Sequence, residues 1–235
     1  MTLKNVKAHL PHDKLSSKIW DDNKKMLPEV REALIRISNE FVEYLGIDID
    51  VVDVTMTGSY ANYNYTPFSD IDLHILVDFN SVNDDLDLVE QFFNAKKSFW
   101  NDRHDIELRG IEVEMYPQKD DEPHASSGVY SVTEDEWVVE PKKFRTEFDL
   151  EFVNKKSEKL KKEIILSIRE AEEENSLESI DRMLKKLKNM RKAGLEKSGE
   201  MSDENIVYKV IRSLGLLQAL FDAKSNITDK NLSLA

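Results

Sequence analysis

Met56-Thr57-Gly58-Ser59, followed after ten residues by Asp70-Ile71-Asp72-Leu73-His74, is the stretch of this sequence that decides the fold. Apolar residues alternate with others over 49–57 and 71–77, which is typical of β-strands. Side chains two positions apart in a strand share a face, so Asp70 and Asp72 point to one side while Ile71 and Leu73 enter the core. The stretch therefore predicts two strands with a carboxylate pair on one face.

The Asp70 and Asp72 carboxylates repel each other unless a cation lies between them. Magnesium and manganese prefer oxygen ligands and often combine one or two carboxylates with the phosphates of a substrate. The sequence contains no cysteine, which excludes disulfides, a thiolate nucleophile and sulfur-bound zinc. We therefore expect a site for Mg²⁺ or Mn²⁺ at the start of the second strand.

Gly58-Ser59 ends the first of these strands. A glycine there leaves the backbone N–H groups open to a phosphate, and the Ser59 hydroxyl adds a further donor. Each half of the pattern is common by itself. A phosphate-binding turn and a carboxylate pair at two strand ends, ten residues apart, form a far more specific combination.

Gly58-Ser59, the ten-residue spacer and Asp70-Ile71-Asp72-Leu73 resemble the signature of nucleotidyltransferases similar to DNA polymerase β. That family uses a third carboxylate on a later strand. Glu114, within Val113-Glu114-Met115-Tyr116-Pro117, resembles the third acid of archaeal CCA-adding and oligoadenylate-type members, and Glu112 on the same strand face is the alternative. Residues 28–78 are also similar to predicted phage and bacterial nucleotidyltransferases of unassigned substrate.

The resemblance implies an α+β fold, a nucleotidyltransferase-like mixed β-sheet flanked by helices. It also implies transfer of a nucleoside monophosphate from a nucleoside triphosphate such as ATP to an acceptor hydroxyl, with release of pyrophosphate. Two Mg²⁺ or Mn²⁺ ions would be held by three side chains, Asp70, Asp72 and Glu114. Nucleotide contacts would come from three successive residues, Gly58, Ser59 and Tyr60.

The chain divides by composition into a catalytic domain, residues 1–141, and a helical substrate-binding domain, residues 142–235. In the first, periodicity predicts helices over 28–45 and 84–100, and a hairpin that turns at Arg109-Gly110 and ends at Pro117. Short strands are expected around Tyr130 and Trp137. The second domain is expected to consist of helices over 145–174, 177–195 and 203–223.

Charge separates the same regions. The formal net charge is −13, from 33 basic and 46 acidic residues. Residues 1–141 carry 13 basic and 29 acidic side chains, whereas residues 142–198 carry 16 and 12. Because nucleic-acid binding needs clustered lysine and arginine, a larger acceptor would be sought on the basic segment. A strip of basic residues fits either a nucleic-acid backbone or a solvated helix face, and it comprises Lys185, Lys186, Lys188, Arg191 and Lys192.

Lys209 and Arg212 lie on one stripe of a predicted helix with Asn205 and Tyr208. They are candidate nucleotide-binding residues that would neutralise a triphosphate, and exposed solubilising charge is the alternative. His74 continues the face of the two aspartates and either contacts substrate or forms a structural hydrogen bond. Residues 62–65, Asn-Tyr-Asn-Tyr, either bind a base or form a turn packed by its own aromatic rings.

We find no apolar stretch of membrane-spanning length and no signal-peptide core, so the expected location is the cytoplasm, with no membrane partner. The expected acceptor is an RNA 3′ end such as that of tRNA, a small molecule or a protein. The alternative from another class is a catalytically inactive nucleotide-binding or regulatory protein that keeps the fold.

Overall fold

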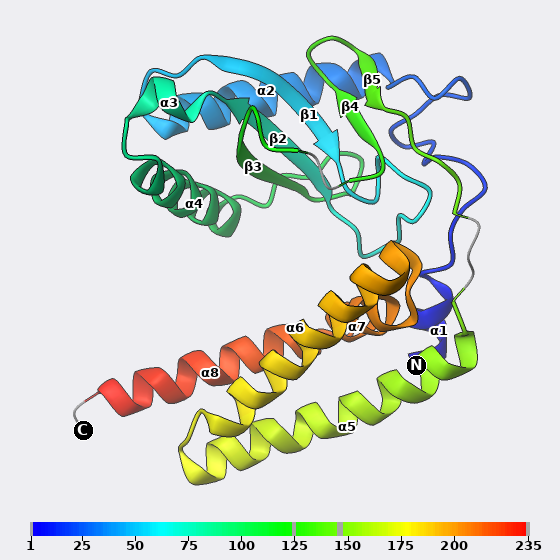
Figure 1. The fold of residues 1–235 in the computed structure, drawn as a ribbon, viewed down its shortest axis with the longest axis vertical. Helices are drawn as coiled ribbons and strands as arrows, with labels where there is room; N and C mark the ends of the chain where they lie inside the picture. Colours follow the sequence, from blue (N-terminus) through cyan, green and yellow to red (C-terminus); the bar gives the residue numbers. More distant parts are fainter. Residues whose placement is uncertain (1, 124–125, 145–147, 234–235) are drawn as a thin grey trace. The chain divides into compact units, whose positions relative to one another are not determined.

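The computed structural model describes residues 2–123, 126–144 and 148–233 of the chain (Figure 1). The chain forms two compact units: a sheet unit of residues 11–143, and a helical unit that joins the residues up to Leu10 to those from Phe144 onward. The sequence placed the first ten residues with the sheet. They belong with the helices because Val6, in α1 (Thr2–Lys7), is fully buried in the core of the helical unit.

The sheet unit contains a five-stranded mixed sheet in the order β3-β2-β1-β4-β5. Its strands are β1 (Val51–Thr57), β2 (Ile71–Val77), β3 (Val113–Lys119), β4 (Val129–Ser131) and β5 (Glu136–Val139). The β2–β3 pair is parallel, and the β1–β2, β1–β4 and β4–β5 pairs are antiparallel. The expected mixed sheet flanked by helices is therefore confirmed.

The two faces of the sheet differ in chemistry. Ile71, Leu73 and Ile75 of β2 and Met115 of β3 are all fully buried, and they share one face. The apolar sides of α2 (Pro28–Leu45) and α4 (Leu86–Arg103) supply further core residues, and the short α3 (Phe79–Val82) precedes α4 (Figure 1). The opposite face carries the half-buried Asp72 and Glu114.

Helix α2 has the bounds that the sequence predicts. Pro28 occupies its first turn, where a missing N–H costs nothing, and the helix ends at Leu45. Gly46 follows with φ of 71°, a left-handed conformation that ends helices at low cost for glycine.

The predicted hairpin at Arg109-Gly110 is partly confirmed. Both residues have positive φ, 54° and 72°, as a two-residue hairpin turn requires. Its first arm is a single bridge between Glu107 and Glu112, so residues 105–108 form no strand. The second arm becomes β3, which pairs with β2 instead.

Pro117 does not end β3, contrary to the prediction. The strand continues to Lys119, and Pro117 stays in register with Ile75 of β2. On the outer edge of β3, the Met115 N–H donates to the Asn101 side chain at 3.1 Å. Pro117 lies two residues further along, so its missing N–H falls on that same unpaired edge, where proline is tolerated.

The helical unit comprises α1, α5 (Leu150–Glu174), α6 (Glu178–Ser198), a 3₁₀ turn at Gly199–Met201, α7 (Asp203–Ser213) and α8 (Leu216–Leu232). Residues 145–147 of the expected first helix lie outside the described residues. The single helix expected over 203–223 is two helices, because Gly215 adopts a left-handed φ of 72° between them. In the described part of the chain, no helix is long and apolar enough to cross a membrane.

Gly194 lies inside α6, although the sequence predicted a break there. A Cβ at this position would come within 2.7 Å of the Glu204 Cβ and 2.8 Å of the Ser202 Oγ. The glycine therefore allows close contact between α6 and the start of α7, and it does not end the helix.

His9 gives the helical unit a pH-dependent stability. Burial, with added repulsion from Lys209 and Arg212, lowers the His9 pKa from 6.5 to about 4. The folded state therefore favours neutral His9, so stability is full above pH 6.5 and falls as pH drops from about 6.5 to about 4. This loss amounts to about 3 kcal/mol.

Denaturant unfolding followed by circular dichroism at several pH values measures this loss. His9→Gln should flatten the profile between pH 4 and 6.5, while the exposed control His104→Gln should leave it unchanged. Equal profiles for the wild type and His9→Gln would refute the assignment.

Candidate active site

The parallel pairing of β2 with β3 brings two carboxylates side by side. Asp72 of β2 is in register with Glu114 of β3, and both lie on the polar face of the sheet. Neighbouring strands are about 4.8 Å apart, so these side chains are direct neighbours. Asp70 precedes β2 by one residue, on the same side of the strand as Asp72.

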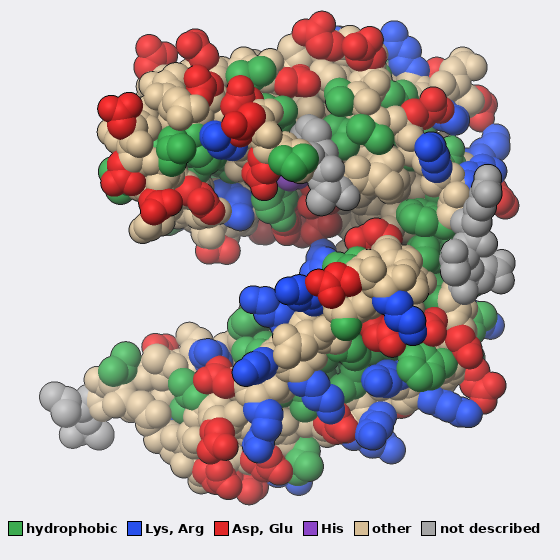
Figure 2. Space-filling model, viewed as in Figure 1, with side chains coloured by type: hydrophobic (Ala, Val, Ile, Leu, Met, Phe, Trp, Pro, Cys, Tyr) green, Lys and Arg blue, Asp and Glu red, His purple; other side chains and the backbone are tan. Residues whose placement is uncertain are grey.

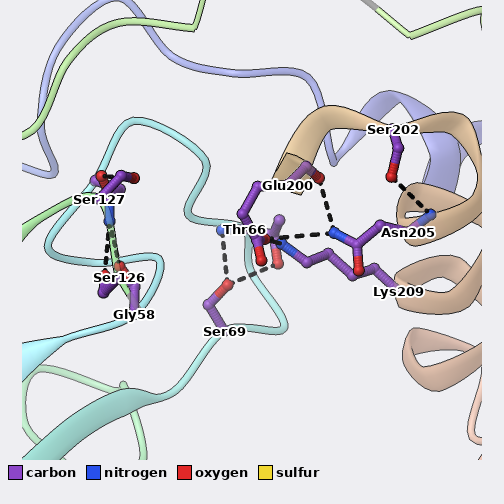
Figure 3. Close-up of polar contacts among 10 residues, drawn as sticks. Gly58, Thr66, Ser69, Ser126, Ser127, Glu200, Ser202, Asn205 and Lys209 are labelled. Atoms are coloured by element: carbon purple, nitrogen blue, oxygen red, sulfur yellow. Dashed lines mark hydrogen bonds and ion pairs between the residues drawn. The ribbon is translucent and has the colours of Figure 1, made fainter. Parts of the chain in front are cut away.

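Gly58 places a backbone turn directly against the Asp72 carboxylate. The residue has φ of 72°, and an added Cβ would lie 1.7 Å from Asp72 Oδ2. The Asn62 amide donates to the Gly58 carbonyl at 2.8 Å, and Ser127 Oγ donates to Asn62 Oδ1 at 3.0 Å. Figure 3 labels Gly58 and Ser127. Ser59 follows as a half-buried residue.

Glu112 and Glu114 differ in their surroundings. Glu112 is exposed and precedes β3, and its carbonyl accepts the Ile71 N–H at 2.8 Å. Glu114 is half-buried within the strand. Desolvation, and then the charges of Glu114 and Asp70, raise the Glu112 pKa. The acidic groups at this end of β2 and β3 therefore act on one another.

Tyr116 is a site residue that the sequence analysis missed. Its hydroxyl donates a hydrogen bond to Glu114 Oε2. Burial raises the Tyr116 pKa, as do this hydrogen bond and the charges of Glu114, Asp72 and Asp70. The sequence did carry a signal for it, because Tyr116 lies two residues after Glu114 and side chains two residues apart in a strand share a face.

His74 belongs to the same row of side chains as Tyr116. The two rings stack with centroids 5.1 Å apart and an interplanar angle of 21°. Thr57 Oγ1 lies 3.1 Å from His74 Nε2. His74 therefore has the structural hydrogen bond that one of its two interpretations predicted.

A pocket of about 280 Å³ opens beside this row. Its described lining residues come from three strands and the loop after β3, and they are Thr57, His74, Tyr116, Pro117, Gln118, Glu122, Pro123 and Ser126.

The aromatic loop over 60–65 packs within the sheet unit. Tyr60 and Tyr63 are 5% and 4% exposed, and the Trp20 indole N–H donates to the Tyr60 carbonyl at 2.7 Å. His12 stacks on Tyr65 with ring centroids 3.9 Å apart. Of the two interpretations, the structure has the self-packed turn.

Lys209 and Arg212 lie on α7 of the helical unit. Lys209 Nζ is 2.7 Å from Glu200 Oε2, and the Asn205 amide donates to the Glu200 carbonyl at the same distance (Figure 3). Asn205 is fully buried, Lys209 is half-buried and Arg212 is exposed, so the stripe is solvated at Arg212 and buried at Asn205.

The predicted strip around Arg191 is not a row of isolated charges. The Arg191 guanidinium lies over the Tyr208 ring at 4.8 Å, and Lys186 pairs with Glu163 at 2.6 Å. Lys192 lies 3.8 Å from Glu196. These contacts favour the interpretation of the strip as a helix surface with charges balanced within the unit.

The oxygen donors of Asp70, Asp72 and Glu114 fit Mg²⁺ or Mn²⁺ in chemical type. Asp72 and Glu114 lie on paired strands, and the charges of all three carboxylates raise the pKa of the Tyr116 hydroxyl. Within the described ranges, no three His, Asp or Glu side chains are already gathered as a metal-binding group. By ligand type, the three carboxylates are suited to Mg²⁺ or Mn²⁺.

The contact between Gly58 and Asp72 yields a prediction. Gly58→Ala should displace the Asp72 carboxylate and weaken Mn²⁺ binding by at least about tenfold, because the new methyl group would overlap Oδ2. Gly110→Ala is a matched control, since Gly110 has the same φ of 72° with nothing within 4 Å of its added Cβ. Electron paramagnetic resonance titration with Mn²⁺ measures both affinities. Equal losses in the two variants would contradict the prediction.

In a comparison with known families, the model of the nucleotidyltransferase domain family matches residues 34–190. Searches of curated proteins and of solved structures return no match. The matched range contains β1, β2 and β3, the turn at Gly58 and the carboxylates of Asp70, Asp72, Glu112 and Glu114. Members of this family usually use divalent metal ions. The chain therefore belongs to the nucleotidyltransferase domain family.

Proposed function

We propose that this protein transfers a nucleoside monophosphate from a nucleoside triphosphate to an acceptor hydroxyl and releases pyrophosphate. The observation that carries the proposal is the register of β2 and β3, which sets Asp72 beside Glu114 under the turn at Gly58. Mg²⁺ is the proposed ion, with Mn²⁺ as a substitute, ATP is among the proposed donors, and the cytoplasm is the proposed compartment.

Asp70, Asp72 and Glu114 would hold two divalent ions. The ions would supply Lewis-acid stabilisation of the charge on the phosphates and a lowered pKa of the attacking hydroxyl. Tyr116, through its hydrogen bond to Glu114, would hold that carboxylate in place. Glu114 would also accept the proton of the acceptor.

The turn after β1 would bind the departing phosphates. Backbone N–H groups at Gly58, Ser59 and Tyr60 and the Ser59 hydroxyl are donors suited to phosphate oxygens. The lack of a side chain on Gly58 leaves the turn in contact with Asp72, so bound phosphates would lie next to the carboxylates. Lys209 and Arg212 stay proposed nucleotide-binding residues of the helical unit, where Lys209 is paired with Glu200.

Asp72→Asn should lower the rate of transfer by more than about 100-fold, because one ligand of the charge-stabilising ions loses its charge. The fold should persist, since Asp72 is a half-buried residue of the polar face. Asp50→Asn, at an exposed position before β1, is the control and should keep wild-type activity.

The measurement is pyrophosphate release, with mass spectrometry of products, after incubation with all four triphosphates and Mg²⁺. Full activity of a folded Asp72→Asn variant would refute the assignment. Tight triphosphate binding by the wild type without turnover would instead favour a catalytically inactive nucleotide-binding protein.

Glu114→Gln and Glu112→Gln separate the two candidates for the third carboxylate. Glu114 is in register with Asp72, whereas Glu112 is exposed and lies before the strand. Glu114→Gln should therefore lower the rate by at least about tenfold more than Glu112→Gln, at matched Mg²⁺ concentration. Initial rates of pyrophosphate release measure the difference. A larger loss in Glu112→Gln would reverse the assignment.

A further inference from the structure

The pocket beside His74 and Tyr116 continues the row of carboxylates along the same sheet face. From Asp72 to His74 on β2, and from Glu114 to Tyr116 on β3, the side chains advance by two strand residues, about 6.6 Å. The pocket shares Tyr116 with the carboxylate site, because the hydroxyl of Tyr116 donates to Glu114 while Tyr116 also lines the pocket. The two sites are therefore adjacent.

The pocket and the phosphate-binding turn lie in opposite directions from Asp72. β1 ends at Thr57, which is in register with Asp72, and Gly58 and Ser59 then continue past the start of β2. His74 and Gln118 lie further along β2 and β3 in the other direction. In-line displacement at phosphorus places the attacking and leaving oxygens on opposite sides. With pyrophosphate at the turn, the attacking hydroxyl would come from the pocket.

The lining of the pocket suits hydroxyl groups. Thr57 and Ser126 supply hydroxyls, His74 an imidazole and Gln118 an amide, all of which exchange hydrogen bonds with alcohols. Two prolines, Pro117 and Pro123, form the apolar part of the wall on which the C–H groups of a ring could pack.

The charges around the pocket disfavour phosphate. The described lining residues include the carboxylate of Glu122 and neither lysine nor arginine. Lys97 is outside this lining, with its Nζ over the Tyr116 ring, 5.0 Å from the ring centroid. The sheet unit, residues 11–143, carries 13 basic and 29 acidic residues, and Figure 2 shows acidic side chains across its visible face. A polyanionic acceptor would be repelled.

We propose that this pocket binds the acceptor, and that the acceptor is a small polyhydroxylated molecule without phosphate. The inference rests on the proposed function. The acceptor hydroxyl oxygen forms a bond to the α-phosphorus as the bond from that phosphorus to the pyrophosphate oxygen breaks. The hydroxyl proton passes to Glu114, and pyrophosphate leaves with the bonding electrons.

Saturation-transfer NMR on the full chain with Mg²⁺ tests the pocket without requiring turnover. The probes are glucose, glucose 6-phosphate and a short RNA oligonucleotide. Gln118→Trp fills the pocket, and Gln91→Trp makes the same change on an exposed position of α4. Glucose should bind the wild type and Gln91→Trp, and bind Gln118→Trp at least about tenfold more weakly. The phosphate-bearing probes should show no such dependence on Gln118.

Three results would overturn the inference: no glucose binding by the wild type, equal glucose binding by both tryptophan variants, or binding of the RNA or glucose 6-phosphate that Gln118→Trp abolishes.

Glu122→Lys, at an exposed position, provides a second test should Gln118→Trp fail to fold. It should shift preference toward glucose 6-phosphate by at least about tenfold, and an unchanged preference would count against the pocket. Pyrophosphate release is scored separately, so loss of the proposed function is distinguishable from loss of the pocket.

Discussion

The pairing of β2 with β3 is the constraint on which the candidate site depends. Because the two strands are parallel and in register, Asp72 lies beside Glu114, and each step of two residues repeats this neighbourhood at His74 and Tyr116. A shift of one residue would turn Glu114 toward the apolar face and put Val113 or Met115 beside Asp72. The core fixes the register, since Ile71, Leu73 and Met115 are fully buried on the opposite face.

The turn at Gly58 completes this arrangement. It brings backbone donors against the same Asp72 carboxylate. Glycine is required here for two reasons: φ is 72°, in the left-handed region, and the Asp72 carboxylate occupies the place where a Cβ would lie. The Asn62 amide donates to the Gly58 carbonyl, and Ser127 in turn donates to Asn62. Backbone donors, carboxylates and the pocket beyond Tyr116 thus follow one another in that order along a single sheet face, which is the order that the proposed in-line transfer of a nucleotidyl group to a bound hydroxyl requires.

Local patterns predicted much of this from sequence. Helix α2, strand β2 and the hairpin turn at Arg109-Gly110 each follow from apolar periodicity or turn chemistry, which neighbouring residues determine. Long-range packing explains what the patterns missed. Pro117 continues β3 because that strand lies at the sheet edge, Gly194 stays helical because α7 packs against it, and Val6 joins a core built from residues more than a hundred positions away. Tyr116 was missed because its partner, Glu114, is recognised as a neighbour of Asp72 only when β3 is paired with β2.

The central claim is that Asp72 and Glu114 act as one metal-binding unit. A double-mutant cycle on Mn²⁺ affinity, followed by electron paramagnetic resonance in the wild type, Asp72→Asn, Glu114→Gln and the double variant, tests it most directly. If the two carboxylates share an ion, each single variant should lose most of the affinity that the double variant loses. Losses that simply add in the double variant would show that the two side chains act independently, and would contradict the account.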